Sequence, residues 1–588
     1  MSLDLTPEQK ATGKANFEQA SGDLARAGKM KSMVTGGTDP KNPDRRDVLK
    51  AALAAGAVVP VSAAVYFGYD SWKGNRAVRT AFIGCGDEGG VLVGDHNPEF
   101  NEIVAVCDIR PSNMKRIFAG EPAGPRKGLN KLYGKDAEKK IAQYDNLDTL
   151  LAEKTRLGLE AVVIATPLNT HDVIAKKCMD AGLHVLCEKL MARDITRCKE
   201  MIKHAKEKGV LLSIGHQRHY SSLYAQAIEV LESNILGDIK HIRALWHRNN
   251  SWPFSASDKD RATYATGNDI DDKPFDIPFY RDGWYKPVLK EDAEGFLKDP
   301  NNLKELGFNS IRELIRWRCF NSTGGGPMAE LGSHQLDASS IILGHVKPLA
   351  VQGVGGKFFY GPGRNDRESD DGVFVTFEFP GPKHSKGGRG GKDDSDIVVV
   401  TYSSFNTNSF EKYGECVMGS RGTMVIEEEK DVYLFKEPQP GKANSGGRDT
   451  KVVVTGAGGD KAAMEATSTW GGGGGAAISK APGSPAWDSA VRGYRTEMEH
   501  FAFCVRQYQK AADKPTDRKV SYEKNKDGSL VNADAMPRCH GEVAMADAII
   551  ALTANLAMAE KERIVFQDDW FNADKMDAVP TSKSGKKA

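Results

Sequence analysis

The stretch AVRTAFIGCGDEG, residues 77–89, predicts a β-strand that runs through a tight turn into a helix. Its glycines have the spacing G-x-G-x-x-G. The first glycine permits the turn, the second lets the backbone approach a pyrophosphate, and the third lets the helix pack on the strand. Free N–H groups at the helix start favour an anion. The residues predicted to bind a dinucleotide here are Gly84, Cys85, Gly86, Asp87, Glu88 and Gly89.

A second apolar run, residues 102–106, leads to Asp108, about 20 residues after Gly89, which is the expected spacing for a ribose-binding acid. A carboxylate here can bind both ribose hydroxyls and would repel a 2′-phosphate, so we expect NAD rather than NADP. Arg110 leaves the alternative open, because a guanidinium could pair with a 2′-phosphate. An ordinary strand–turn–helix with an edge aspartate would also give this pattern.

The composition of the 588 residues is that of a soluble globular protein, with 27% charged and 40% hydrophobic residues. A net charge of +1 gives no basic field for nucleic acid, so we expect no such partner. The nine cysteines are scattered, several of them in apolar runs, which indicates buried thiols rather than a disulfide framework.

The N-terminal region, residues 1–75, is predicted to be a disordered leader. Arg45 and Arg46, followed by Val48-Leu49-Lys50 and the apolar residues 51–69, resemble a twin-arginine export signal. The apolar stretch could be cleaved or could stay as a single membrane anchor. This predicts a periplasmic or cell-envelope protein, or a cytoplasmic one if the leader is not recognised. A buried alanine-rich helix is the alternative.

The rest of the chain divides into two predicted domains. Residues 76–218 alternate apolar strands with amphipathic helices, which predicts a parallel α/β sheet. Residues 219–568 contain alternating and β-branched runs, which predict an α+β domain with a large, mainly antiparallel sheet. Residues 569–588 are predicted to form a disordered tail.

Three further segments carry a resemblance to a known family: Thr166-Pro167 with His171, then Glu188-Lys189, and then Gly324–Gly326 leading to Glu330 and His334. With the glycine loop, they resemble the glucose–fructose oxidoreductase, inositol dehydrogenase and rhizopine-catabolism (Gfo/Idh/MocA) family over residues 78–562. The resemblance implies a Rossmann domain plus a domain with an open-faced sheet, and homo-oligomers formed through that sheet. It also implies cofactor contacts at Thr166, Pro167, His171, Glu188 and Lys189.

The resemblance also implies the catalytic residues Lys189, His334 and Glu330. Lys189 would reach the reacting hydroxyl and the nicotinamide, although Leu190 stands where the family's Glu-Lys-Pro motif has proline. His334 would take the hydroxyl proton as general base. Glu330 replaces the usual aspartate four residues before the histidine, on the same helical face, where it could orient the imidazole or bind a substrate hydroxyl.

Two other features leave alternatives open. Residues 252–318 are rich in aromatic, acidic and arginine residues, including Trp317, and form either a sugar-binding wall or an insertion that packs or dimerises. His216 and His219 invite a metal site, but the sequence offers no third ligand at a typical spacing, so we expect no metal.

These residues predict an NAD(P)-dependent oxidoreductase acting on a hydroxyl of a sugar or cyclitol, with a tightly held cofactor. One alternative is a redox-neutral, NAD-dependent glycosidase or eliminating enzyme, favoured by export because free NAD is scarce outside the cytosol. A second alternative is a non-catalytic sugar-binding protein on the same fold.

Overall fold

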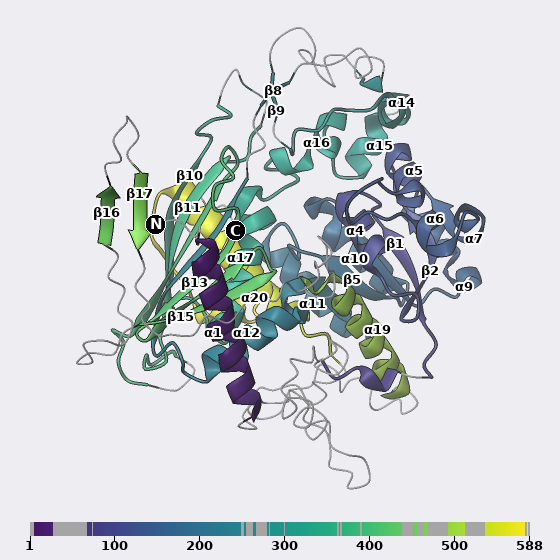
Figure 1. The fold of residues 1–588 in the computed structure, drawn as a ribbon. Helices are drawn as coiled ribbons and strands as arrows, with labels where there is room; N and C mark the ends of the chain where they lie inside the picture. Colours follow the sequence, from purple (N-terminus) through teal and green to yellow (C-terminus); the bar gives the residue numbers. More distant parts are fainter. Residues whose placement is uncertain are drawn as a thin grey trace, which may run out of the picture.

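A computed structural model provides the structure of the protein. It describes residues 5–26, 67–248, 252–254, 263–265, 279–437, 451–455, 463–467, 492–511 and 536–588, apart from short gaps at 73, 282, 299, 362–363, 365–366, 388–390, 583–584 and 586–587. The chain forms two domains side by side, each built on its own sheet (Figure 1).

The first domain is a six-stranded, fully parallel sheet with the strand order β3-β2-β1-β4-β5-β6. Its strands are β1 (Val78–Ile83), β2 (Asn101–Cys107), β3 (Ala142–Tyr144), β4 (Ala161–Ile164), β5 (His184–Glu188) and β6 (Leu212–Gly215). Its helices are α4 (Asp87–Asp95), α5 (Pro111–Ala119), α6 (Leu129–Tyr133), α7 (Ala137–Lys140), α8 (Leu147–Ala152), α9 (Lys154–Leu157), α10 (His171–Asp180) and α11 (Ile195–Lys208). This is the predicted parallel α/β sheet of a Rossmann domain.

The second domain is a mixed, mostly antiparallel sheet with the strand order β15-β14-β13-β7-β12-β11-β10-β18, in which only the β7–β12 pair is parallel. Its strands are β7 (Ile239–His247), β10 (Ala350–Gly356), β11 (Gly372–Pro380), β12 (Ile397–Phe405), β13 (Tyr413–Gly419), β14 (Gly422–Glu427), β15 (Asp431–Lys436) and β18 (Ile564–Val565). Two separate hairpins pair β8 (Trp252–Phe254) with β9 (Phe279–Arg281) and β16 (Lys451–Thr455) with β17 (Ala463–Thr467). The two sheets confirm the predicted fold class.

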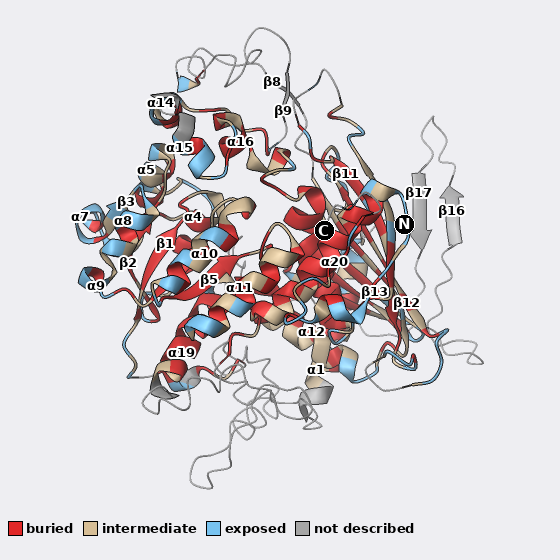
Figure 2. Cartoon of the chain, turned by 180° about the vertical axis from the view of Figure 1, so that it is seen from behind, coloured by how far each residue is buried: buried red, intermediate tan, exposed pale blue. Residues whose placement is uncertain are grey.

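Helices fill the space between the two sheets (Figures 1 and 2). They include α12 (Ser222–Glu232), the π-helical turn η5 (Met328–Gly332), α17 (Ser333–Ile342) and α20 (Gly541–Glu560). By length and composition α20 could cross a membrane, but 72% of its apolar window is buried, as expected for a core helix. Three more helices, α14 (Lys290–Lys298), α15 (Pro300–Glu305) and α16 (Ile311–Ile315), lie over the edge of the first domain near α5.

The predicted domain boundaries need three corrections, of which the first concerns the leader. Residues 5–26 are not disordered, because α1 (Pro7–Arg26) packs along the edge strand β15 and buries Phe17 and Ala20. The Asn16 amide also donates to the Leu434 carbonyl at 2.9 Å. The predicted leader also extends too far, since Tyr69 is fully buried against the first domain and donates to Glu499. Residues 27–66, with the twin arginines, lie outside the described residues.

The second correction concerns α19 (Tyr494–Ala511), which the sequence assigns to the second domain. Its apolar stripe, including Phe501 and Val505, packs into the core of the first domain with Phe82 and Val106. Arg506 adds a bidentate ion pair to Glu160. Although α19 lies far along the chain after the end of the predicted Rossmann domain at residue 218, it belongs to that domain because its apolar residues pack on the sheet.

The third correction concerns the C-terminal tail, which the sequence predicts to be disordered. Trp570 and Val579 are buried in the apolar cluster to which both domains contribute. The Lys199 ammonium, on α11, donates to the carbonyls of Lys575 and Ala578 at 2.7 and 2.8 Å. These contacts order the tail despite its polar composition.

Candidate functional site

The three glycines of the loop are required for different reasons. A Cβ at Gly84 would lie 2.4 Å from the Ala165 carbonyl oxygen, and one at Gly89 would lie 2.0 Å from the Gly84 carbonyl oxygen, so both positions require glycine for packing. Gly84 also has a positive φ of 91°. A Cβ at Gly86 would meet no protein atom closer than 3.8 Å, and Gly86 lines a pocket. The space beside Gly86 therefore fits the approach of a pyrophosphate.

Asp108 lies at the end of β2, as predicted, and organises the loop. Its carboxylate accepts hydrogen bonds from the backbone N–H groups of Cys85 (2.7 Å) and Arg110 (2.8 Å) and from the Asn113 amide (3.1 Å). The Arg110 guanidinium forms an ion pair with Asp292, with an N–O distance of 2.9 Å. The Asp292 side chain is fully buried, so Arg110 is already engaged by the protein.

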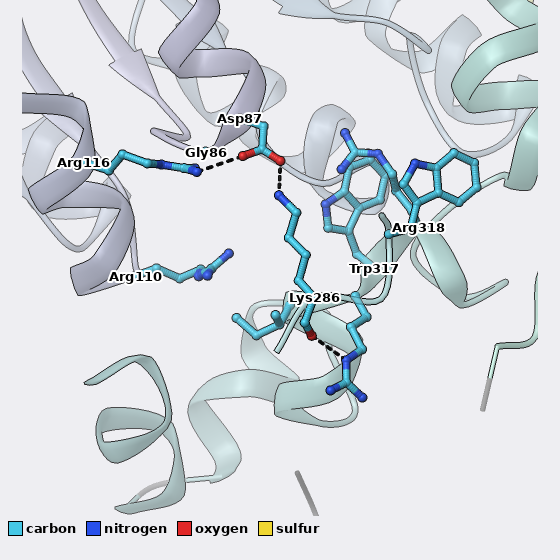
Figure 3. Close-up of a pocket in the computed structure, with 10 residues that line it drawn as sticks. Gly86, Asp87, Arg110, Arg116, Lys286, Trp317 and Arg318 are labelled. Atoms are coloured by element: carbon cyan, nitrogen blue, oxygen red, sulfur yellow. Dashed lines mark hydrogen bonds and ion pairs between the residues drawn. The ribbon is translucent and has the colours of Figure 1, made fainter. Parts of the chain in front are cut away.

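Residues 284–298 and 300–318, which we call the strap, lie over the glycine loop. Lys286 forms an ion pair with Asp87 (Figure 3). The backbone carbonyl of Lys286 accepts from the Arg316 guanidinium. Ile109, next to Asp108, packs against the apolar core of the strap. The strap thus closes the groove in which the loop predicts the dinucleotide.

The pocket between strap and loop is strongly cationic. Burial alone would raise the pKa of Asp87, but Lys286 and Arg116 hold it below its ordinary value. Such a lining suits the two charges of a pyrophosphate. Its residues are Gly86, Asp87, Arg110, Arg116, Trp284, Lys286, Ile315, Arg316, Trp317 and Arg318. Trp317, predicted to contact substrate, lies here with the Arg318 guanidinium 4.2 Å above its ring.

Behind the loop, three carboxyl groups are buried together. Burial, and next the neighbouring Glu88, raise the pKa of Glu188 well above its ordinary value. Burial likewise raises the pKa of Glu497, with Glu188 contributing next. Burial therefore disfavours the charged form of both acids. Glu497, on α19, was missed by the sequence analysis.

Lys189 directly follows β5, and its ammonium donates to the backbone carbonyl of Glu330 at 2.8 Å. The contact brings together two of the predicted catalytic segments, one from each domain. The Lys189–Leu190 peptide bond is cis. The carboxylate of Glu330, on the π-helical turn, accepts from the Arg318 guanidinium at 2.6 Å. Glu330 therefore pairs with a strap arginine that the sequence analysis did not single out.

His334 lies in the first turn of α17 with a 7% exposed side chain. Its ring centre is 5.4 Å from that of Trp246. Within the described part of the chain, no hydrogen bond to the imidazole is present. Burial, and next the charge of Lys189, lower the pKa of His334 well below its ordinary value. The imidazole is therefore neutral at pH 7 and able to accept a proton.

The predicted segment Thr166-Pro167 with His171 serves the local structure. His171 is buried, with its two ring nitrogens 2.9 Å from the carbonyl oxygens of Leu190 and Thr166. It thus joins the end of β4 to the turn that carries Lys189. The Thr166 hydroxyl accepts from Thr170 at 2.8 Å, and Pro167 precedes the short 3-10 turn Leu168–Thr170. Cofactor contacts at these three residues remain a prediction.

Both domains resemble those of known proteins. Residues 78–216 match the family model described as "Oxidoreductase family, NAD-binding Rossmann fold", and residues 302–523 match the model of the family's "C-terminal alpha/beta domain". The chain is 28% identical over 200 residues to a glycosyl hydrolase family 109 protein of Stenotrophomonas maltophilia, an alignment covering 33% of this chain and 39% of the relative.

It is also 34% identical over 93 residues to inositol 2-dehydrogenase 1 of Saccharopolyspora erythraea, covering 16% of this chain and 27% of the relative. Both alignments span less than half the length of these curated relatives. A solved inositol dehydrogenase homologue from Azotobacter vinelandii, in complex with NAD+, superposes with a TM-score of 0.51 at 15% identity, covering 84% of this chain and 98% of that one, and so shares the fold.

Both halves of the chain thus match the two domain models of one family, and its glycine loop is that of an NAD-binding domain. The chain belongs to the Gfo/Idh/MocA family of NAD-binding oxidoreductases.

Proposed function

We propose that the protein is an NAD-dependent oxidoreductase that acts on a hydroxyl of a sugar or cyclitol. The observation that carries the proposal is the contact of Lys189 with the Glu330 carbonyl, which brings a cation from the first domain to the helix that bears neutral His334. The substrate class rests on inositol 2-dehydrogenase 1 among the relatives.

In this proposal His334 accepts the proton of the substrate hydroxyl at a ring nitrogen. Its neutral state is the reactive one, and its burial excludes competing water. The Lys189 ammonium stabilises the negative charge that develops on the same oxygen. Bound NAD supplies the hydride acceptor for the carbinol carbon. The Glu330–Arg318 pair keeps the π-helical turn, and with it the carbonyl that binds Lys189, at a fixed distance from the strap.

We propose further that NAD is bound tightly and preferred over NADP. The strap covers the groove, and its Lys286–Asp87 and Asp292–Arg110 ion pairs lie directly over the glycine loop. Because Arg110 is paired with a buried carboxylate, it is not available to a 2′-phosphate. Asp108, next to it, would repel that phosphate.

A redox-neutral reaction is the second candidate, and the glycosyl hydrolase family 109 relative favours it. In such a reaction the bound cofactor would hold the hydride from a sugar carbon while a neighbouring proton and the leaving group are lost. For a glycosidase, water would then add to the unsaturated sugar before the hydride returns to the same carbon. A cofactor closed in by the strap suits this cycle because it needs no exchange. Product formation without net NADH would distinguish it from a dehydrogenase.

Substitution of Lys189 by alanine and of His334 by glutamine tests the proposal against the third possibility, a binding protein. We expect each variant to bind NAD and lose turnover by about 10²–10⁴-fold. Hydride transfer is followed at 340 nm with a panel of sugars and cyclitols, and ligand affinity by calorimetry. Variants that turn over like the wild type would refute the assignment of these residues.

Export and assembly are also proposed. Arg45-Arg46 would direct the folded protein, with its cofactor, to the periplasm or cell envelope. Replacing both by lysine should retain it in the cytoplasm. Val354 and Phe374 are paired across β10 and β11 and are 62% and 46% exposed, which favours a homo-oligomer through this sheet face. Phe374→Asp should then lower the mass measured by light scattering.

A further inference from the structure

Three buried side chains from distant parts of the sequence converge where the two domains meet. His216 directly follows β6, Asp337 lies on α17, and Asp547 lies on α20. A ring nitrogen of His216 and one oxygen of each carboxyl group all lie within 4.8 Å of one another. The three residues are at most 1% exposed.

His216 is the member of this cluster that lacks partners: among the residues that the structure describes, no hydrogen bond reaches either of its ring nitrogens. The side chains of Asp337 and Asp547 lie within hydrogen-bond distance of each other, and apart from that contact their Oδ2 atoms have no partner among the described residues. His216 Nδ1 lies 3.7 Å from Asp337 Oδ2, which is too long for a hydrogen bond. It is close to the separation of about 3.4 Å between two ligands of one tetrahedral zinc ion with bonds near 2.1 Å.

The charges of the cluster also call for a cation. Two neighbouring buried carboxylates repel each other unless a proton or a metal ion lies between them. A divalent ion with two carboxylates and one neutral imidazole sums to zero charge. The Arg218 guanidinium nearby is already neutralised by Glu429 at 2.5 Å, so it does not replace such an ion.

The surroundings of the cluster resemble a second ligand shell. Asp337 Oδ1 accepts from His219 Nε2 at 2.7 Å, which fixes the carboxyl group and leaves Oδ2 directed at the cluster. Hydrogen bonds of this kind orient metal-binding side chains in proteins. His219, which the sequence pairs with His216, therefore supports the site from outside.

We propose that His216, Asp337 and Asp547 bind one divalent first-row transition-metal ion, of which zinc is the type. The ion joins the end of β6 to α17 and α20 and so ties the Rossmann domain to the helix that carries His334, one turn before Asp337. Its role is to position that helix, and it takes no part in hydride transfer.

The full-length protein, produced in zinc-supplemented medium and purified without chelator, tests the proposal by elemental mass spectrometry. We expect about one zinc ion per chain and a lower melting temperature after treatment with a chelator. The near-isosteric variants Asp547→Asn and His216→Gln should lose at least nine-tenths of the metal. The matched control Asp95→Asn, which alters a buried carboxyl group on α4, should keep it.

A metal-free wild type whose melting temperature is unchanged by zinc or chelator would overturn the proposal and leave a shared proton between the two acids. Metal retained by both cluster variants would overturn it as well. If the variants do not fold, the test is the visible absorption spectrum of the wild-type protein with cobalt in place of zinc. Intense visible bands of a tetrahedral ion support the site, and their absence contradicts it.

Discussion

The ion pair between the buried Asp292 and Arg110 is one of the contacts that hold the strap over the glycine loop. Asp292 accepts from the Arg110 guanidinium at 2.9 and 3.1 Å and from the backbone N–H and hydroxyl of Ser112 at 3.0 and 2.7 Å. Its side chain is fully buried, and that of Arg110 is 19% exposed. The variant Asp292→Asn keeps the shape but removes the charge.

An asparagine can still accept from Ser112, so the expected loss is the charge-assisted bond to Arg110, about 1.5–3 kcal/mol. If opening of the strap limits release of the nucleotide, the loss of this energy makes the release rate about 10 to 100 times higher. The variant also removes the carboxylate that pairs with Arg110, so its guanidinium becomes available to a 2′-phosphate. The ratio of the affinities for NAD and NADP should therefore fall.

The assay is displacement of bound NADH, followed by its fluorescence in a stopped-flow instrument. The matched control is Lys115→Ala, which breaks the neighbouring pair with Glu291, whose side chains are 74% and 36% exposed. An exposed pair is screened by solvent and contributes little, so the control should release NADH less than about fivefold faster. Equal rates for Asp292→Asn and wild type would refute the reasoning that the strap retains the cofactor.

Three further predictions concern the loop, the base and the N-terminal helix. Gly89→Ala should lower the melting temperature because its Cβ lies 2.0 Å from a carbonyl oxygen, whereas Gly86→Ala should fold normally and bind NADH weakly; equal melting temperatures would contradict this. Because burial lowers the pKa of His334 well below its usual 6.5, its neutral form persists as the pH falls, and the acid limb of kcat/KM should lie well under pH 6.5. An acid limb with an apparent pKa near 6.5 would contradict the assignment of the buried His334 as the general base. Phe17→Ala should reduce the free energy of unfolding by about 3 kcal/mol in urea melts, and an unchanged midpoint would mean that α1 is not docked.

Local patterns predict the first domain well, because each signal there reports on its own neighbourhood. The strand before the glycine loop, the stop of α11 at Gly209 in a left-handed conformation, and Asp108 at the end of β2 all follow from a few adjacent residues. The alternating strands of the second sheet are predicted for the same reason, since one buried face imposes a period of two.

Contacts between distant segments account for what the sequence analysis missed. The Rossmann helix α19, the docked α1 and the ordered tail each depend on a partner surface hundreds of residues away. Glu330 was expected beside His334, but the π-helical turn and Arg318 decide where its carboxylate lies. The sequence analysis did not find the cluster around His216, because its other two members, Asp337 and Asp547, lie on two helices far away in the sequence.

We propose that this oxidoreductase holds NAD beneath the strap. The most direct test is to purify the protein without added nucleotide, denature it, and identify the released dinucleotide by mass and absorbance. The account predicts close to one NAD per chain, with NADP nearly absent. A protein that releases no dinucleotide, and binds added NAD only weakly, would contradict it.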